Sequence, residues 1–179
     1  MPAMKKEIRR EVRRRISELS AEQMAMAAES IFIQIEKLQI FNKAHSIALF
    51  ASMHDEVPTD FALRRWSELG KRIVVPRVEG DVMRFYDYSP ERMRTGAFGI
   101  LEPEGDVECM PEEIDLIIVP ARAFTTRGER LGRGGGFYDK YMSQREFRAA
   151  KVGIAFGCQT FDELPCDEHD ICVDEVVTE

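Results

Sequence analysis

The sequence has no apolar run that approaches the roughly 20 residues needed to cross a bilayer, and its charged N-terminus lacks the apolar stretch of a signal peptide. Cysteine is scarce. Cys109, Cys158, Cys166 and Cys172 form no CxxC pair and have no spacing to the three histidines that would suit zinc. These absences argue against a disulfide framework and a structural metal site. They predict a cytoplasmic protein with reduced thiols and no membrane attachment.

Positive charge is in the minority, because 25 lysines and arginines face 32 acidic residues and the formal net charge is −7. This balance argues against a protein whose whole surface binds nucleic acid, while local basic patches are still allowed. With 179 residues, 44% of them hydrophobic, the chain can bury one core but not two comfortable ones. We therefore expect a single domain over residues 1–179.

The N-terminal part has the periodicity of two helices. Residues 4–19 repeat apolar side chains at helical spacing, and lysines and arginines surround this stripe. Ser20 is suited to cap a second helix that runs to about Gln39, with Gln23 at the capping-box position. Taken alone, the basic first helix fits a solvated surface or an RNA-binding patch.

Short apolar runs follow, and they are typical of buried strands. A helix is predicted between the first two runs, over residues 58–70, with Thr59 and Asp60 as candidate caps. This strand–helix–strand order favours an α/β sheet wound by helices, in which ligands bind beyond the carboxyl ends of the strands. Residues 83–88 are a further candidate strand, in a meander or at an edge. The runs predicted as strands are 47–50, 73–75, 114–119, 152–156 and 173–177.

The most informative stretch is residues 130–139, which read RLGRGGGFYD. Glycine admits positive φ and lets backbone N–H groups approach a ligand, and arginine pairs with phosphate oxygens. Residues 137–147 have helical composition, so the loop is expected to lead into a helix N-terminus that favours anions. Neither the Walker pattern nor the dinucleotide fingerprint fits. The stretch is therefore interpreted as a phosphate-binding loop, with a flexible surface turn as the alternative.

Several motifs in a consistent order extend this interpretation to nearly the whole chain. They are KKEIR at 5–9, SMHDEVPT at 52–59, GILEP at 99–103, the glycine-rich loop, and the ending from Gln159 through Val173-Asp174-Glu175. Together they resemble the 5-formyltetrahydrofolate cyclo-ligase family, also called methenyltetrahydrofolate synthetase. The resemblance implies a three-layer α/β fold with an open, mostly parallel sheet flanked by helices, of the NagB/RpiA/CoA transferase-like type.

The resemblance also implies a reaction. It is the ATP- and Mg²⁺-dependent cyclisation of 5-formyltetrahydrofolate to 5,10-methenyltetrahydrofolate, with release of ADP and phosphate. ATP phosphorylates the formyl oxygen, N10 attacks the activated carbon, and phosphate leaves. Catalysis of such a transfer consists mostly of positioning and charge stabilisation. The implied partner is the folate substrate, with or without a polyglutamate tail, and not nucleic acid or a membrane; a monomer is expected.

Site residues follow from the resemblance, position by position. Arg133, near the transferring phosphoryl group, and Tyr138 are the candidate catalytic residues. Asp139 and Asp170 are the candidate Mg²⁺ ligands, since Mg²⁺ takes one or two carboxylates beside phosphate oxygens. The implied ATP-binding residues are Lys5, Lys6, Arg9, Arg130, Leu131, Gly132, Arg133, Gly134, Gly135, Gly136, Phe137 and Tyr138. The implied folate-binding residues are Ala51, Met53, Glu56, Arg133, Gly134, Gly135, Gly136 and Phe137, with Phe85 as a further apolar wall.

Glu56 is assigned to the pterin edge because a carboxylate can accept two parallel N–H bonds from an aminopyrimidone. Structural alternatives stay open, since Glu56 also suits a helix-leading acid and Asp139 a helix cap. Cys158 and Cys166 fit small, partly buried positions, and none of the histidines is assigned catalysis. His54 is expected near the folate loop, and His169 is expected to orient the Asp170 segment.

The chain departs from the family pattern at four positions. Phe137 stands where many relatives have tyrosine, Ala121 and Arg122 replace a small-then-apolar pair, and Thr125 replaces an acid. Two other classes of function stay open. A nucleotide- or RNA-binding module would use the basic helix and the glycine loop without catalysis. A sugar-phosphate isomerase or acyl-transfer enzyme on a similar frame would need no ATP, and only the site separates such enzymes.

Overall fold

The computed structural model describes residues 2–179. Its helices are α1 (Pro2–Ser17), α2 (Ala21–Glu36), α3 (Gln39–Lys43), α4 (Asp60–Glu68) and α5 (Phe137–Met142), with short 3-10 turns η1 (Ala97–Gly99), η2 (Pro111–Glu113) and η3 (Gly157–Gln159). Its strands are β1 (Ser46–Ala48), β2 (Arg72–Glu79), β3 (Val82–Asp87), β4 (Met93–Thr95), β5 (Leu101–Pro103), β6 (Glu108–Cys109), β7 (Leu116–Val119), β8 (Ala123–Phe124), β9 (Arg130–Leu131), β10 (Ala150–Ile154) and β11 (Glu175–Val177).

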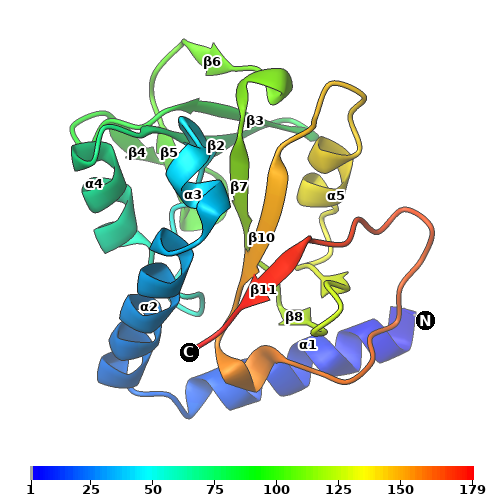
Figure 1. Ribbon diagram of the computed structural model, residues 1–179. Coiled ribbons are helices and arrows are strands. Elements are labelled where there is room, and N and C mark those ends of the chain that lie inside the picture. Colours follow the sequence, from blue (N-terminus) through cyan, green and yellow to red (C-terminus); the bar gives the residue numbers. More distant parts are fainter. Residues whose placement is uncertain (1) are drawn as a thin grey trace.

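The centre of the molecule is a seven-stranded sheet in the order β11-β10-β7-β1-β2-β3-β6 (Figure 1). The first five strands in this order pair in parallel. Strand β3 is antiparallel to β2, and β6 is antiparallel to β3. The predicted βαβ unit is present as β1, α4 and β2. The predicted meander strand is β3, but it is not at the edge of the sheet, because β6 pairs with its outer side.

Alternate residues along each strand point to opposite faces of the sheet, and each face has its own core. Ile47 and Ile73 belong to the core covered by α1 to α4, whereas their neighbours Ala48 and Val74 belong to the core covered by α5. Strands buried on both faces explain the continuous apolar runs of the sequence. The three-layer, mostly parallel α/β fold is therefore confirmed.

The helices differ from the predicted ones mainly in length. The Ser20 capping box is present, with Gln23 N donating to Ser20 Oγ at 3.0 Å and Ser20 N donating to Gln23 Oε1 at 2.8 Å. The prediction that this helix runs to Gln39 was wrong. Extended backbone at Leu38 separates α2 from α3 and lets Phe41 pack on the buried Trp66 ring, with 4.9 Å between ring centroids.

The prediction that the glycine loop leads into a helix is confirmed, since α5 begins at Phe137, although the helix covers only the first part of the stretch 137–147. Backbone N–H groups of Ser143 and Gln144 satisfy carbonyls of the last turn, and Tyr141 and Met142 are buried under the sheet. The helix is shorter than the stretch of helical composition because the chain must turn here to enter β10. No helix within residues 2–179 has both the length and the apolar character required to cross a membrane. The four cysteines are free thiols.

Two small hairpins complete the fold, and the sequence patterns did not predict them. Strands β8 and β9 pair at Ala123–Leu131 and Phe124–Arg130, so they hold the start of the glycine-rich loop. Strands β4 and β5 form the other hairpin, which contacts β2. Arg77 fixes the segment after β5, because its Nη1 donates to the carbonyls of Pro103 and Gly105 at 2.9 and 2.8 Å. Both hairpins border the cavity described next.

Candidate active site

A cavity of about 940 Å³ lies at the carboxyl ends of the central parallel strands. Phe50 and Ala51 follow β1, Pro120 and Ala121 follow β7, and Pro76 lies in β2 just beyond the residues that pair in parallel with β1. This volume is at the upper end of the range for small-ligand pockets, roughly 300–1,000 Å³. The predicted site residues that line it are Lys5, Arg9, Ala51, Met53, Glu56, Arg130, Leu131, Gly132, Arg133, Gly134, Gly135, Gly136, Phe137, Tyr138, Asp139 and Asp170.

The loop after β1 is closed by its own side chains. Ser52 N donates to Thr59 Oγ1 and Thr59 N donates to Ser52 Oγ, both at 3.0 Å. The fully buried Thr59 hydroxyl donates to the Phe50 carbonyl at 2.7 Å, so Thr59 begins α4 without capping it by its side chain. This mutual anchoring fixes the loop that carries Asp55 and Glu56.

Glu56 lines the cavity as a buried carboxylate. Its Oε1 accepts a hydrogen bond from Met53 N at 2.8 Å, and its Oε2 lies 3.6 Å from Nη2 of Arg133. Burial raises the pKa of Glu56, although the Met53 hydrogen bond and Arg133 act in the opposite direction. Glu56 is therefore an acceptor that has lost most of its water.

The glycine-rich loop connects β9 to α5 along one wall of the cavity. Gly134 has φ +116° and Gly136, which precedes α5, has φ +71°, values that disfavour any residue with a side chain. Arg133 lies between Gly132 and Gly134, and its side chain is 40% exposed. Because α5 has only six residues, its dipole contributes little, and the loop's arginines and backbone N–H groups are the main anion-attracting features.

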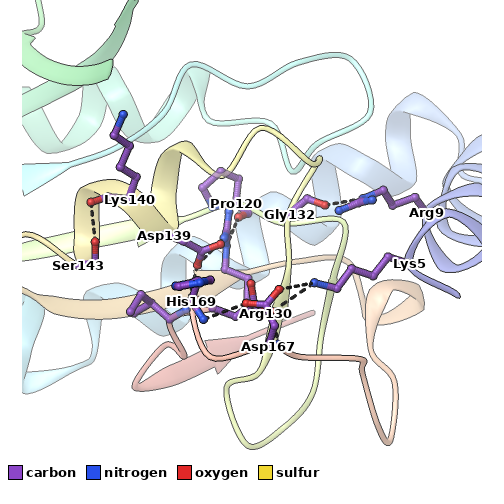
Figure 2. A network of polar contacts seen from close by, with 12 residues as sticks. Lys5, Arg9, Pro120, Arg130, Gly132, Asp139, Lys140, Ser143, Asp167 and His169 are labelled. Carbon is purple, nitrogen blue, oxygen red and sulfur yellow. Dashed lines mark hydrogen bonds and ion pairs between the residues drawn. The ribbon is translucent and has the colours of Figure 1, made fainter. Parts of the chain in front are cut away.

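Arg130 lines the cavity and is held by polar contacts with Pro120 and Asp139 (Figure 2). Its Nε donates to the Pro120 carbonyl at 3.0 Å, its Nη1 lies 3.4 Å from Asp139 Oδ1, and its guanidinium lies over the Tyr138 ring at 5.3 Å. Burial lowers the pKa of Arg130, and the charge of Asp139 opposes this shift. Burial raises the pKa of Tyr138, so its phenol is a hydrogen-bond donor at neutral pH.

Helix α1 contributes two cations to the cavity, and they stand at i and i+4 on one face. Lys5 Nζ lies 3.2 Å from Asp167 Oδ2 and 3.4 Å from Asp170 Oδ2, and Arg9 Nε donates to the Gly132 carbonyl at 2.8 Å (Figure 2). Burial acts to lower the pKa of Lys5, but the contacts with Asp167 and Asp170 outweigh it and raise the pKa. Lys6 is exposed and does not line the cavity, so the structure separates it from the other predicted residues.

Asp139 and Asp170, the predicted magnesium ligands, both line the cavity. Asp139 Oδ1 accepts from Ile171 N at 3.0 Å, and Asp170 Oδ2 accepts from Asp167 N at 2.9 Å. These contacts leave the opposite oxygen of each carboxylate available to a ligand. Within residues 2–179, no group of three or more His, Cys, Asp or Glu residues is arranged to hold a metal by itself. The two carboxylates therefore fit a Mg²⁺ ion whose other ligands are phosphate oxygens and water.

Most apolar residues that line the cavity were not predicted from the sequence. Phe85, one predicted wall residue, lies in the core against Tyr141 at 4.8 Å between ring centroids, and Met83 lines the cavity instead. His45 and His54 are exposed and outside the cavity, whereas His169 is at its rim. Strand alternation is the only pattern that marks these positions, and it does not tell which face borders a ligand. The missed apolar wall residues are Phe50, Pro76, Val78, Met83, Phe98 and Ile100, and the acidic Glu102 also lines the cavity.

The family model of 5-formyltetrahydrofolate cyclo-ligases matches residues 2–179. The chain belongs to this family. The 5-formyltetrahydrofolate cyclo-ligase of Mus musculus is 31% identical to it over 189 aligned positions, which cover 98% of this chain and 93% of the relative. The cyclo-ligase of Escherichia coli K12 is 34% identical over 143 positions, which cover 75% and 78% of the two chains.

The fold is also similar to that of a solved structure of a methenyltetrahydrofolate synthetase. The NMR structure of Aquifex aeolicus 5,10-methenyltetrahydrofolate synthetase superposes with a TM-score of 0.86 at 35% identity, and the match covers 97% of this chain and 89% of that one. Membership of the cyclo-ligase family makes the chain a ligase acting on folate. It decides against the RNA-binding module and the isomerase that the sequence patterns left open.

Proposed function

We propose that the chain catalyses the ATP-dependent conversion of 5-formyltetrahydrofolate to 5,10-methenyltetrahydrofolate, with release of ADP and phosphate. The observation that carries this proposal is the division of one cavity into two chemically different ends. The glycine loop, Lys5 and Arg9 make one end cationic, and an apolar wall with the buried Glu56 makes the other. A reaction between a polyphosphate and a flat heterocycle needs both ends in one enclosure.

At the cationic end, Lys5, Arg9 and Arg130 surround the loop and supply a positive potential for the triphosphate. Backbone N–H groups between Gly132 and Gly136 approach the phosphate oxygens without a side chain in the way. Asp139 and Asp170 would hold Mg²⁺, which supplies charge neutralisation of the phosphates when it is bound. Lys6 is not part of this proposal, because it points to solvent.

At the apolar end, Met53 and its neighbours contact the pterin, and Glu56 accepts N–H bonds from its aminopyrimidone edge. A carboxylate that has already lost its water gains more from such a pair of bonds than an exposed one. Glu56 works best when ionised, so folate binding is expected to weaken as pH falls through its raised pKa.

Arg133 connects the two ends. It belongs to the phosphate loop, yet its Nη2 lies 2.6 Å from Asp55 Oδ1 and 3.6 Å from Glu56 Oε2. A formamide oxygen is a poor leaving group, so its phosphorylation must precede closure. N10 then attacks the formyl carbon and gives up its proton, the C–O bond breaks, and phosphate leaves with its electron pair. Arg133 is placed to stabilise the charge of the transferring phosphoryl group.

The groups assigned to both ends come from one chain, and we propose that a monomer is the active form. The test of the function is an absorbance assay for the methenyl product, with purified protein, 5-formyltetrahydrofolate and Mg²⁺. We expect product only with ATP, at about one ADP per methenyl group formed. Chelation of the metal should stop both signals together. Product without ATP, or ADP release without product from folded protein, would contradict the proposed reaction.

A further inference from the structure

Arg122 is a buried cation outside the cavity, in the turn between β7 and β8. Its side chain is only 4% exposed, and its Nη1 donates to Asp55 Oδ2 at 2.8 Å. Its Nη2 is buried and has no hydrogen-bond partner within residues 2–179. A buried guanidinium with an unsatisfied nitrogen costs free energy. Packing alone does not explain an arginine at this position.

Asp55 connects Arg122 to the glycine loop. One carboxylate oxygen, Oδ2, accepts from Arg122, and the other, Oδ1, accepts from Nη2 of Arg133 at 2.6 Å. Burial acts to raise the pKa of Asp55, but the two arginines outweigh it and lower the pKa, so the carboxylate stays charged. The three side chains form a continuous chain of charge-assisted hydrogen bonds.

The two arginines of this chain of contacts differ in rigidity. The backbone of Arg122 is held on both sides, since its N–H donates to the Leu131 carbonyl at 2.8 Å and its carbonyl accepts from Gln159 Nε2 at 3.0 Å. Gln159 itself is buried. Arg133 is 40% exposed and lies between Gly132 and Gly134, where neighbouring residues give little support. Arg122, through Asp55, can therefore set the orientation of the more exposed Arg133 side chain.

We propose that Arg122 is a positioning residue for the reaction, which through Asp55 holds the Arg133 guanidinium beside Glu56. The inference rests on the role proposed above for Arg133. Both ion pairs of Arg133 involve Nη2, which leaves Nε and Nη1 to donate to the transferring phosphoryl group. An apolar residue at 122 would leave Asp55 free to turn, and the orientation of Arg133 would be lost with it.

The test is a double-mutant cycle on kcat with Arg122→Met and Arg133→Lys. Because small misplacements of a catalytic group are costly, we expect Arg122→Met to lower kcat about tenfold to a hundredfold in the wild-type background. The same substitution in the Arg133→Lys background should change kcat by less than about twofold, because its effect passes through a guanidinium that this background lacks; independent sites would instead show the same loss in both backgrounds to within about twofold. Arg127→Met is the matched control, an arginine on the same segment whose side chain is mostly exposed and outside the cavity.

Two outcomes would overturn the proposal. One is wild-type kcat in folded Arg122→Met, and the other is an equal loss of kcat in both backgrounds, which would mean that Arg122 does not act through Arg133. Should Arg122→Met not fold, Asp55→Asn breaks the same connection and must show the same dependence on residue 133. A failure of the role proposed for Arg133 can be told apart from these outcomes. Normal kinetics of Arg133→Ala would show that Arg133 has no part in the reaction, whatever the effect of Arg122→Met.

Discussion

The two ends of the cavity are built in opposite ways. The cationic end is made from short sequence segments, the glycine loop and the first turns of α1, and its cations are held by single polar contacts, such as those of Lys5 with Asp167 and Asp170. The apolar end gathers Pro76, Val78 and Met83 from two paired strands of the sheet, and the exposed Phe98 from a 3-10 turn between β4 and β5. Charge acts over distance, whereas an apolar wall acts through close contact.

The adjacent carboxylates of Asp55 and Glu56 also differ, in the direction of their pKa shifts and in their contacts. The pKa of Asp55 is lowered because two arginines outweigh its burial, whereas burial raises the pKa of Glu56, which shares only the more distant Arg133 contact. Adjacent carboxylates thus take different tasks, one fixing an arginine and the other facing the ligand. The two side chains are almost equally exposed, and they differ in their cations: Asp55 accepts from two guanidinium groups at 2.6 and 2.8 Å, whereas Glu56 has one at 3.6 Å.

Removal of Arg133 should have the largest effect, because it connects the two ends. We expect Arg133→Ala to lower kcat by about 10²–10³-fold, the usual loss when a donor to a developing charge is removed. Since the side chain is 40% exposed, the free energy of unfolding should change by less than about 1 kcal/mol. Steady-state kinetics and chemical denaturation measure the two quantities. A large loss of stability would assign Arg133 to the fold instead.

Substitution of Glu56 should affect the apolar end alone. Hydrogen bonds to a charged acceptor contribute about 1.5–3 kcal/mol, so Glu56→Gln should raise KM for folate by about 10- to 100-fold. KM for ATP should stay near its wild-type value. In the wild type, KM for folate should rise as pH falls through the raised pKa of Glu56, because the protonated carboxyl group loses acceptor capacity. If Glu56→Gln keeps the wild-type pH dependence of KM for folate, a group other than Glu56 is responsible for it.

The smallest effect should come from α1, where two neighbouring lysines make a matched comparison. Lys5 lines the cavity and contacts Asp167 and Asp170, whereas Lys6 is exposed outside it. Loss of one partly exposed cation is worth about 1 kcal/mol, so Lys5→Met should raise KM for ATP about fivefold. Lys6→Met should leave KM for ATP unchanged. Equal effects of both variants would mean that α1 acts only by its overall charge.

Most of the fold could be predicted from the sequence, because its determinants are local. Apolar runs of strand length, the Ser20–Gln23 capping box and the helix between the first two runs gave the α/β class and the βαβ unit correctly. The end of α2, the end of α5 and the small hairpins could not be predicted. They depend on which side chains are buried against distant elements, as Phe41 is against Trp66.

The sequence by itself determined the glycine loop, the basic face of α1 and the candidate acids, because each is a short segment or single residue whose chemistry is visible in the residue types. Only the tertiary structure decided that Lys5 and not Lys6 reaches the cavity, and that Met83 and not Phe85 lines it. It also decided that Arg122 is buried behind Asp55. Burial and side-chain direction depend on contacts between segments far apart in the chain, and these contacts set which of two similar residues meets the ligand.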